Sequence, residues 1–428
     1  MTIPPISLEA ADSPSNPVAF DHELSALPKQ RALLWTMFVA NLGMATLWGA
    51  IGSIFLAVQL QTLNPDNKVG SLSLAIGLGA IGAMVASPIA GTLSDRTRTR
   101  IGGRAPWMIG GLGVAVAATV YMGFATSTIE LIIAFVVVQV GTSFVASPLI
   151  AHIPDRVPSG RRGVFSSING LGTLIGSVVG QAVGAAFSGS IPLGYIAVAV
   201  TFGVAIGVFL IVNAGQSNVG VPREPFAVTD LLRTFWVNPI KYPDFFWAFT
   251  GRLLIITGYY LVGSFGLYIL QDYIGLGAGA VSVVPIVGVC VLVGIISSTI
   301  IAGPLSDRIG RRKIFIFIAS AVLAVSILIP FVWPSVAGML TFAFLSGFGF
   351  GAYQAVDYAL VTQVLPSKEN AGRDLGIINI TATLPQTFGV AVAGLIVVLF
   401  GGYAALFPIA AAITIVGAVA IIPIRSVR

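Results

Sequence analysis

Long apolar stretches recur along the whole of this 428-residue chain and constrain its fold more than any other feature. A helix needs about 20 mostly apolar residues to cross the roughly 30 Å hydrocarbon core of a bilayer. Twelve stretches meet that length, at residues 33–60, 70–94, 105–125, 129–153, 164–189, 191–214, 244–271, 278–304, 313–333, 335–364, 374–400 and 402–424. The sequence therefore predicts an all-α membrane protein of twelve transmembrane helices in two six-helix bundles.

The composition is that of a chain folded in lipid. Hydrophobic residues make up 56% of the sequence and charged residues only 9%, whereas soluble domains carry about 25% charged residues. The 50 glycines suit close packing of membrane helices, because small residues let helix backbones approach one another. The single cysteine, Cys290, excludes an internal disulfide framework and a thiolate metal cluster.

Polar segments divide the chain into four parts. Residues 1–30 have no basic segment followed by an apolar core, so they read as a disordered cytoplasmic tail rather than a signal peptide. Residues 215–243 form the one long polar interruption, and we expect them to be a cytoplasmic linker. The other two parts, 31–214 and 244–428, are the expected N-terminal and C-terminal six-helix bundles.

Basic residues predict which helix ends face the cytoplasm. Twenty of the 22 lysines and arginines fall in the tails, the linker and alternate loops, whereas the loops of the opposite face hold only Lys68. Cytoplasmic loops of membrane proteins carry the excess of Lys and Arg, so both termini are predicted to be cytoplasmic. The net charge of +6 then reflects topology in the cytoplasmic membrane, and no nucleic-acid partner is expected.

The two halves repeat each other. Residues 91–96 read Gly-Thr-Leu-Ser-Asp-Arg, and residues 303–308 read Gly-Pro-Leu-Ser-Asp-Arg at the same place in the second half. Asn169 and Asn379 are a second correspondence between the halves, in the fifth and eleventh apolar stretches. Two parallel repeats place a binding site at their interface near the middle of the membrane. Helices 1, 4, 7 and 10 are expected to line it.

This duplicated motif resembles the signature between helices 2 and 3 of the major facilitator superfamily. The longer string at residues 87–107, with its run of arginines, is similar to that of the glycoside–pentoside–hexuronide:cation symporters and the sucrose:proton symporters. The resemblance implies a secondary transporter with the twelve-helix fold of that superfamily.

The charges of the motif suit a gate. An Asp at a helix end and nearby arginines can form charge-assisted hydrogen bonds that hold one conformation and break in another. The alternative is that these charges only anchor the topology. The expected gating residues are Asp95, Arg96, Arg104, Asp307, Arg308 and Arg311.

The sequence departs from the resembled symporters at their carboxylates. The sodium-site aspartates of melibiose-type members correspond here to Ala83, Ser87 and Ala146, which disfavours sodium coupling. Sucrose symporters place an acid seven residues after a helix 4 proline, and Asp155 has that spacing from Pro148. Asp155 is therefore either a proton carrier or a structural charge at a helix end.

Two charged residues lie well inside apolar sequence, Arg252 in the seventh stretch and Asp357 in the tenth. Buried charges in membranes usually pair or line an aqueous path. Arg252 follows Pro243 by nine residues, and Asp357 precedes Pro366 by nine, so both lie about 13–14 Å from the same membrane face. We expect the two to be partners, either as a pair that breaks on protonation of Asp357 or as a permanent salt bridge; the third alternative is direct contact with the substrate.

Polar and aromatic residues at helical spacing suggest a site for a neutral polyol. Helix 1 places Asn41, Trp48, Phe55 and Gln59 on one stripe. Sugars need hydrogen-bonding groups around the ring and a flat apolar surface for their C–H face. The alternative is that the aromatic residues only pack between helices. The candidate substrate-binding residues are Asn41, Trp48, Gln139, Ser143, Tyr259, Tyr353, Gln354, Asn379 and Gln386.

These observations favour secondary active transport of a sugar or glycoside, coupled to a proton, by a monomer in membrane lipid. No phosphate-binding loop, nucleophile motif or His/Cys metal cluster is present, so an enzyme, a resident metal and a cofactor are not expected. The alternative within this architecture is a proton-driven exporter of drugs or of a neutral or apolar metabolite. A non-transporting scaffold is disfavoured because it has no use for two gate motifs.

Overall fold

The computed structural model describes residues 17–213, 219, 242–309, 312–363 and 371–424 of the chain. In the N-terminal half, the helices are α1 (Pro17–Ala50), a π-helical turn η1 (Ile51–Phe55), α2 (Leu56–Leu63), a 3-10 turn η2 (Pro65–Asn67), α3 (Lys68–Arg96), α4 (Ala105–Met122), α5 (Thr128–Arg156), a 3-10 turn η3 (Ser159–Arg161), α6 (Arg162–Ala186) and α7 (Ile191–Asn213). In the C-terminal half they are α9 (Pro243–Gly263), α10 (Gly266–Tyr268), a π-helical turn η4 (Ile269–Tyr273), a 3-10 turn η5 (Gly277–Gly279), α11 (Ala280–Ile309), α12 (Arg312–Val332), α13 (Val336–Gln363), α14 (Ala371–Leu399) and α15 (Leu406–Val419).

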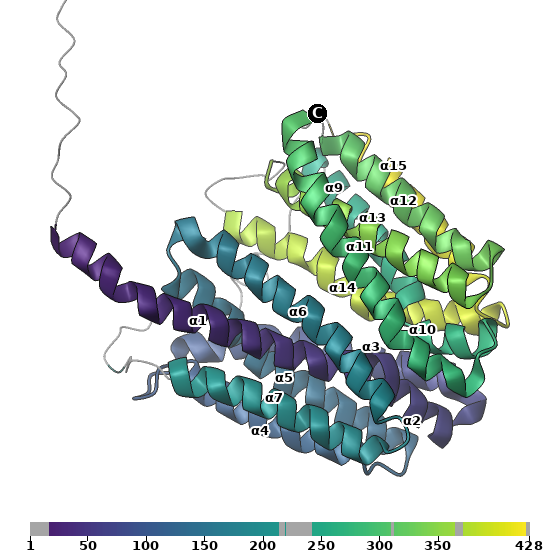
Figure 1. The fold of residues 1–428 in the computed structure, drawn as a ribbon, viewed down its shortest axis with the longest axis horizontal. Helices are drawn as coiled ribbons and strands as arrows, with labels where there is room; N and C mark the ends of the chain where they lie inside the picture. Colours follow the sequence, from purple (N-terminus) through teal and green to yellow (C-terminus); the bar gives the residue numbers. More distant parts are fainter. Residues whose placement is uncertain (1–16, 214–218, 220–241, 310–311, 364–370, 425–428) are drawn as a thin grey trace, which may run out of the picture.

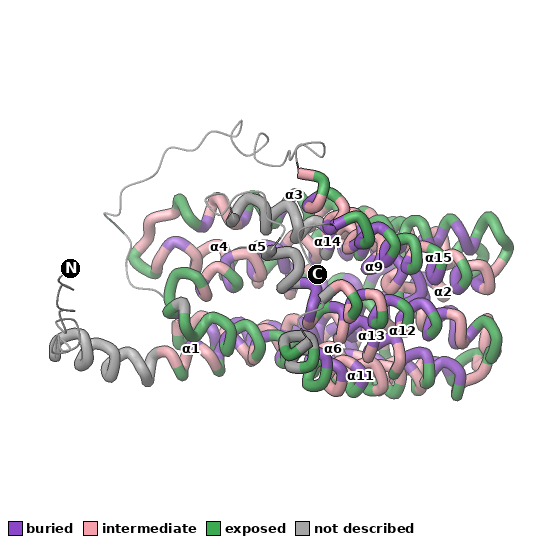
Figure 2. The backbone as a smooth tube through the Cα atoms, turned by 90° about the horizontal axis from the view of Figure 1, so that it is seen from above, coloured by how far each residue is buried: buried purple, intermediate pink, exposed green. Residues whose placement is uncertain are grey.

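The helices overlap the expected membrane spans, although the span expected at 244–271 is interrupted after Gly263. Within the described residues, 10 helical segments are long and apolar enough to cross a membrane. The last two expected spans coincide with α14 and α15, whose apolar stretches are shorter, at Leu384–Leu399 and Leu406–Val419. Many exposed side chains are large and apolar, among them Ile129, Ile211 and Val332, and exposed and buried residues alternate along the same helices (Figure 2). The outer surface is therefore suited to lipid.

Helix α1 begins earlier than expected. Residues 1–30 were predicted to be a disordered tail, but α1 is helical from Pro17. Its first turns include Ala19, Glu23 and Leu24, which are good helix formers, so the helix extends beyond the apolar stretch that defines the span. Residues 1–16 and most of the expected linker lie outside the described residues.

The two halves share one packing order. In the N-terminal half, α1 packs on α6 and α7, and α5 packs on α3 and α4. In the C-terminal half, α9 packs on α14 and α15, and α13 packs on α11 and α12. Corresponding helices therefore have corresponding neighbours, as the repeated motif predicts.

A glycine stripe on α6 explains its close contact with α1. Gly172, Gly176, Gly180 and Gly184 recur every fourth residue and are all buried. A Cβ atom at Gly176 or Gly180 would overlap the carbonyl oxygens of Leu42 and Thr46, respectively. Because only glycine leaves this space free, the backbones of α1 and α6 lie in direct contact.

The halves meet at one end of the molecule. Contacts between them lie mainly between α3 and α14 and between α6 and α11, where Gly394 packs on Ser73 and Gly288 packs on Gln181. Figure 1 shows the helices of the two halves converging near α2 and α10 and diverging toward their opposite ends. We call the converging end, which carries Leu63 and Lys68, the closed end. The opposite end, which carries Arg96, Arg104 and Arg156, is the arginine-rich end.

Candidate functional site

An ion pair lies inside the C-terminal half. The Nη1 atom of Arg252, on α9, donates to Oδ2 of Asp357, on α13. The other carboxylate oxygen, Oδ1, accepts a hydrogen bond of 2.7 Å from the hydroxyl group of Tyr353, one turn earlier on α13. The structure therefore brings together the two charges that the sequence placed at equal depth, and it adds Tyr353 to them.

Burial makes this pair energetically demanding. The side chain of Asp357 is 4% exposed and that of Arg252 is 14% exposed, and Tyr353 is fully buried. Removing one partner of a buried pair typically costs about 3–5 kcal/mol, because it leaves an uncompensated charge in a medium of low polarity. A proton that neutralises Asp357 would therefore strongly change the stability of this region.

The two partners differ in how fully their hydrogen-bonding groups are used. Both oxygens of Asp357 have a donor, one from Arg252 and one from Tyr353. A guanidinium carries five N–H donors, but the Nε atom of Arg252 is buried and has no hydrogen-bond partner among the described residues. The arginine thus retains donor capacity that the protein does not use here.

Aromatic residues lie two turns further along α9. The ring of Tyr259 stacks on that of Phe350, on α13, with centroids 4.2 Å apart and planes 6° apart. The neighbouring Tyr260 accepts a hydrogen bond of 3.1 Å from Nε2 of Gln386, on α14. Sequence reasoning singled out Tyr259 and Gln386 but missed Phe350 and Tyr260, for which a position on expected cavity-lining helices was the only available signal.

The polar candidate residues of the N-terminal half mostly donate hydrogen bonds to carbonyl oxygens of their own helices. Asn41 donates to the carbonyl oxygen of Met37 at 2.8 Å, and Ser143 donates to that of Gln139 at 2.8 Å. Trp48 makes an edge contact with Phe135, with centroids 6.1 Å apart. The Trp48–Phe135 contact joins α1 to α5, and these residues do not form a polar cluster comparable to that of the C-terminal half.

The expected stripe on helix 1 does not continue to its end. Phe55 is fully buried and packs on Tyr195, with centroids 5.0 Å apart. Gln59 donates to the carbonyl oxygen of Met122 at 2.8 Å. Both side chains therefore point into the N-terminal half. The π-helical turn η1 contains Phe55 and precedes Gln59, and its extra residue changes the phase of the helix across this segment.

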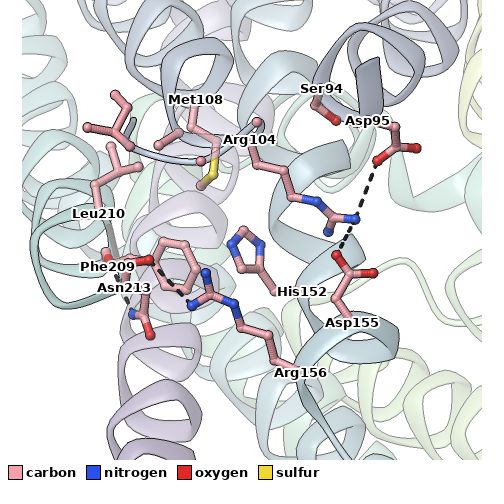
Figure 3. A pocket seen from close by; sticks show the side chains of 14 residues that line it. Ser94, Asp95, Arg104, Met108, His152, Asp155, Arg156, Phe209, Leu210 and Asn213 are labelled. Atoms are coloured by element: carbon pink, nitrogen blue, oxygen red, sulfur yellow. Dashed lines mark hydrogen bonds and ion pairs between the residues drawn. The ribbon is translucent and has the colours of Figure 1, made fainter. Parts of the chain in front are cut away.

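A second charged cluster lies at the arginine-rich end of the N-terminal half. Nη2 of Arg104 lies 2.6 Å from Oδ2 of Asp155 and 3.4 Å from Oδ1 of Asp95. Arg104 thus bridges the end of α3 to the end of α5 (Figure 3). Both acids are at least half exposed, at 50% and 64%, so this cluster sits in a far more aqueous setting than Asp357.

The same cluster lines a pocket of about 240 Å³. His152 and Arg156 reach it from α5, and Phe209 and Asn213 reach it from α7 (Figure 3). The Nδ1 atom of His152 lies 2.7 Å from the carbonyl oxygen of Pro148, and its ring makes an edge contact with Phe209. Sequence reasoning assigned no role to His152, which here fills space between α5 and α7. This pocket shares no residue with the Arg252–Asp357 pair.

Polar contacts join the two halves at the closed end. Nζ of Lys68 lies 2.7 Å from Oδ2 of Asp272 and 4.9 Å from the centroid of the Tyr268 ring. Asp272 also accepts a hydrogen bond of 3.0 Å from the hydroxyl group of Tyr403. The hydroxyl group of Tyr268 donates to the carbonyl oxygen of Ala57 at 2.8 Å. The sequence marked Lys68 only as a lone basic residue.

The sequence profile of the Major Facilitator Superfamily matches residues 33–301 and 295–427, and so covers nearly all of the chain. This protein belongs to the major facilitator superfamily. As a member of that superfamily it is a multi-pass membrane transporter of small molecules and not an enzyme.

Solved structures with the same fold include transporters of different substrates. A variant of the nucleoside transporter NupG is 13% identical, with a TM-score of 0.73 and coverage of 92% of this chain and 99% of that chain. A D-xylose-proton symporter is 14% identical, with a TM-score of 0.68 and coverage of 92% and 97%. A bacterial homologue of the lysosomal transporter Spinster is 16% identical, with a TM-score of 0.64 and coverage of 92% and 95%.

A curated relative matches part of the chain. The MFS transporter asaE of Aspergillus flavus is 32% identical over 171 residues, which are 39% of this chain and 36% of that protein. The chain thus spans about a third of the length of this relative. The match agrees with membership of the major facilitator superfamily and assigns no substrate.

The remaining predicted site residues are located only by their positions on the helices. The side chains of Asp307, Arg311 and Asn379 lie outside the described residues. Arg96, Arg308 and Gln354 are described and exposed, the two arginines at the arginine-rich ends of α3 and α11 and Gln354 next to Tyr353 on α13.

Proposed function

We propose that this transporter moves a sugar or glycoside across the cytoplasmic membrane together with a proton, by alternating access. The observation that carries the proposal is the buried triad of Arg252, Asp357 and Tyr353. Asp357 is the carboxylate that lies deep in a membrane-spanning segment and holds a charged partner, so protonation there removes a buried ion pair. Proton uptake at Asp357 would then favour one conformation of the C-terminal half over the other.

Sidedness follows from the arginines. Arg96, Arg104 and Arg156 share one end of the molecule. Cytoplasmic loops of membrane proteins carry an excess of Lys and Arg. On this assignment both termini are cytoplasmic and the closed end faces outward. The structure would then be in the inward-facing state, with Lys68 and Asp272 holding the outer ends together.

A polar, hydroxyl-bearing substrate fits the side chains near the pair. Tyr259, Tyr260 and Gln386 provide hydroxyl and amide groups beside the stacked ring of Phe350, and sugars use such a mixture of hydrogen bonds and flat apolar surface. Two of the solved structures of this fold are named as a D-xylose-proton symporter and a nucleoside transporter, so the architecture accommodates ligands that contain a sugar ring.

The test is uptake by purified protein in liposomes with a panel of labelled sugars, with and without an imposed pH gradient. Accumulation of a sugar that an uncoupler abolishes would support the proposal. Extrusion of dyes together with indifference to every sugar would contradict it and would favour the exporter. Asp357→Asn should abolish the pH-driven component, and its full retention would refute the coupling role.

A further inference from the structure

At the closed end, an ammonium group from one half lies in a set of ligands built by the other half. Nζ of Lys68, at the start of α3, lies 2.7 and 2.9 Å from the two carboxylate oxygens of Asp272 and 4.9 Å from the centroid of the Tyr268 ring. The hydroxyl group of Tyr403 donates to the same carboxylate at 3.0 Å. We call Tyr268, Asp272 and Tyr403, which all belong to the C-terminal half, the ammonium cage.

The ammonium cage is held together within its own half. Tyr268 precedes Asp272 by four residues, and Tyr268 and Tyr403 are both buried. Tyr273, next to Asp272 in η4, packs on Phe407 of α15, with ring centroids 5.3 Å apart. The carboxylate and the aromatic face therefore stay side by side without Lys68, and such a combination attracts ammonium groups by charge and by the cation–π interaction.

Separation of the halves at this end vacates the ammonium cage. Lys68 leaves with α3, and the hydroxyl group of Tyr268 loses the carbonyl oxygen of Ala57, to which it donates at 2.8 Å in the closed arrangement. The Lys68–Asp272 pair is partly exposed, at 18% and 36%, and pairs this exposed are weak. A solute that carries an ammonium group can therefore compete with Lys68 for the carboxylate.

The charge around the cage also favours a cation. The described segments at the closed end carry the acids Asp66, Glu130 and Asp272 and the single base Lys68. Glu130 is held at the start of α5 by its capping contacts with Ser127, and Asp66 is exposed in η2. An excess of one sign of charge around an opening raises the local concentration of ions of the other sign.

We propose that the ammonium cage is a regulatory site for a small primary ammonium ion, which takes the place of Lys68 when the closed end opens and holds that end open. On the sidedness proposed above, the ion comes from outside the cell. The site lies apart from the Arg252–Asp357 pair, so the inference is independent of the transported substrate and of proton coupling.

The first test measures binding of n-propylammonium, which supplies the three carbon atoms and the nitrogen atom that Lys68→Ala removes. Saturation-transfer NMR is recorded on purified protein in detergent, at constant ionic strength. Lys68→Ala should bind the ion about fivefold more tightly than the unaltered protein, because its cage has lost the competing lysine. The double variant Lys68→Ala/Asp272→Asn should lose this gain, and neutral n-propanol should not distinguish the three proteins. Equal binding of n-propylammonium by all three would overturn the proposal.

The second test measures opening of the closed end. A cysteine at Ser73, which packs on Gly394 across the interface, is labelled by an anionic methanethiosulfonate in a Cys290→Ser background. n-Propylammonium at about twice its dissociation constant should raise the labelling rate by about threefold, since binding to the open state alone shifts the population by that factor. Potassium chloride of the same ionic strength controls for screening of the Lys68–Asp272 pair. Asp272→Asn should remove the difference between the two salts. Equal labelling in the two salts with Asp272 present would contradict the regulatory role.

Discussion

Lys68, the first residue of α3, and Asp272, in the π-helical turn η4, form an ion pair that joins the two halves of the transporter at its closed end. Tyr403 supports the pair by donating to Asp272, and burial together with the nearby Asp272 carboxylate raises the pKa of this tyrosine, so it stays protonated. The pair is partly exposed, at 18% for Lys68 and 36% for Asp272. Pairs of this kind contribute up to about 1 kcal/mol, so it biases the closed state and does not lock it.

Reversing one charge of this pair should open the closed end. Lys68→Glu or Asp272→Lys should each increase the population of the open state by about fivefold, because repulsion between like charges is added to the loss of up to about 1 kcal/mol of attraction. The measurement is labelling of a cysteine at Ser73, which packs on Gly394 across the interface, by an impermeant maleimide in a Cys290→Ser background. The double variant Lys68→Glu/Asp272→Lys should return labelling to its original rate. An unchanged labelling rate in both single variants and in the double variant would contradict this role.

The glycine stripe of α6 should tolerate no side chain where it contacts α1. Gly180→Ala places a methyl group on the carbonyl oxygen of Thr46, and overpacking of this kind costs about 1–3 kcal/mol. The melting temperature in detergent should fall. Gly170→Ala is the matched control on the same helix, because a Cβ there meets no atom within 4 Å. Equal melting temperatures of the two variants would contradict direct contact between the backbones of α1 and α6.

Asp155 should not carry the coupled proton. Its side chain is 50% exposed and paired with Arg104 at the arginine-rich end, so its loss removes a surface interaction worth at most about 1 kcal/mol. Asp155→Asn should keep pH-driven accumulation of substrate and lose less than about fivefold in uptake rate. If accumulation disappears while the protein remains folded, Asp155 and not Asp357 is the proton site.

Tyr353 should set the pH at which uptake responds. Its hydroxyl group donates to the carboxylate of Asp357, which favours the ionised form, so Tyr353→Phe makes protonation easier. Hydrogen bonds to charged groups are worth about 1.5–3 kcal/mol, so the midpoint of the pH profile should move upward by about one to two units. Tyr195→Phe is the control, since that buried hydroxyl has no partner among the described residues. A downward shift, or equal effects of both changes, would contradict the role of Tyr353.

The pairing of Arg252 with Asp357 could be predicted because helix depth is readable from sequence. Both residues stand nine positions from a proline near the same end of their helices, and a helix rises by a constant distance per residue. Counting from these prolines therefore gave two depths that agree. The repeated motif similarly predicted that the two halves would share one packing order.

Other features depend on geometry that a sequence pattern does not contain. The π-helical turn at Ile51–Phe55 falls in an ordinary apolar stretch, so the change of phase that turns Gln59 toward Met122 was not foreseen. The contact of Lys68 with Asp272 joins residues from different halves and depends on how the two bundles tilt against each other. Periodicity within one helix carries no information about that tilt.

In the proposed mechanism, protonation of Asp357 couples the proton to the movement of substrate. The most direct measurement compares Asp357→Asn with the unaltered protein in liposomes, using both accumulation under an imposed pH gradient and exchange of substrate at equal pH on the two sides. The variant should keep exchange but should no longer raise the internal concentration of substrate above the external one. Accumulation equal to that of the unaltered protein would show that the buried pair is a permanent structural bridge.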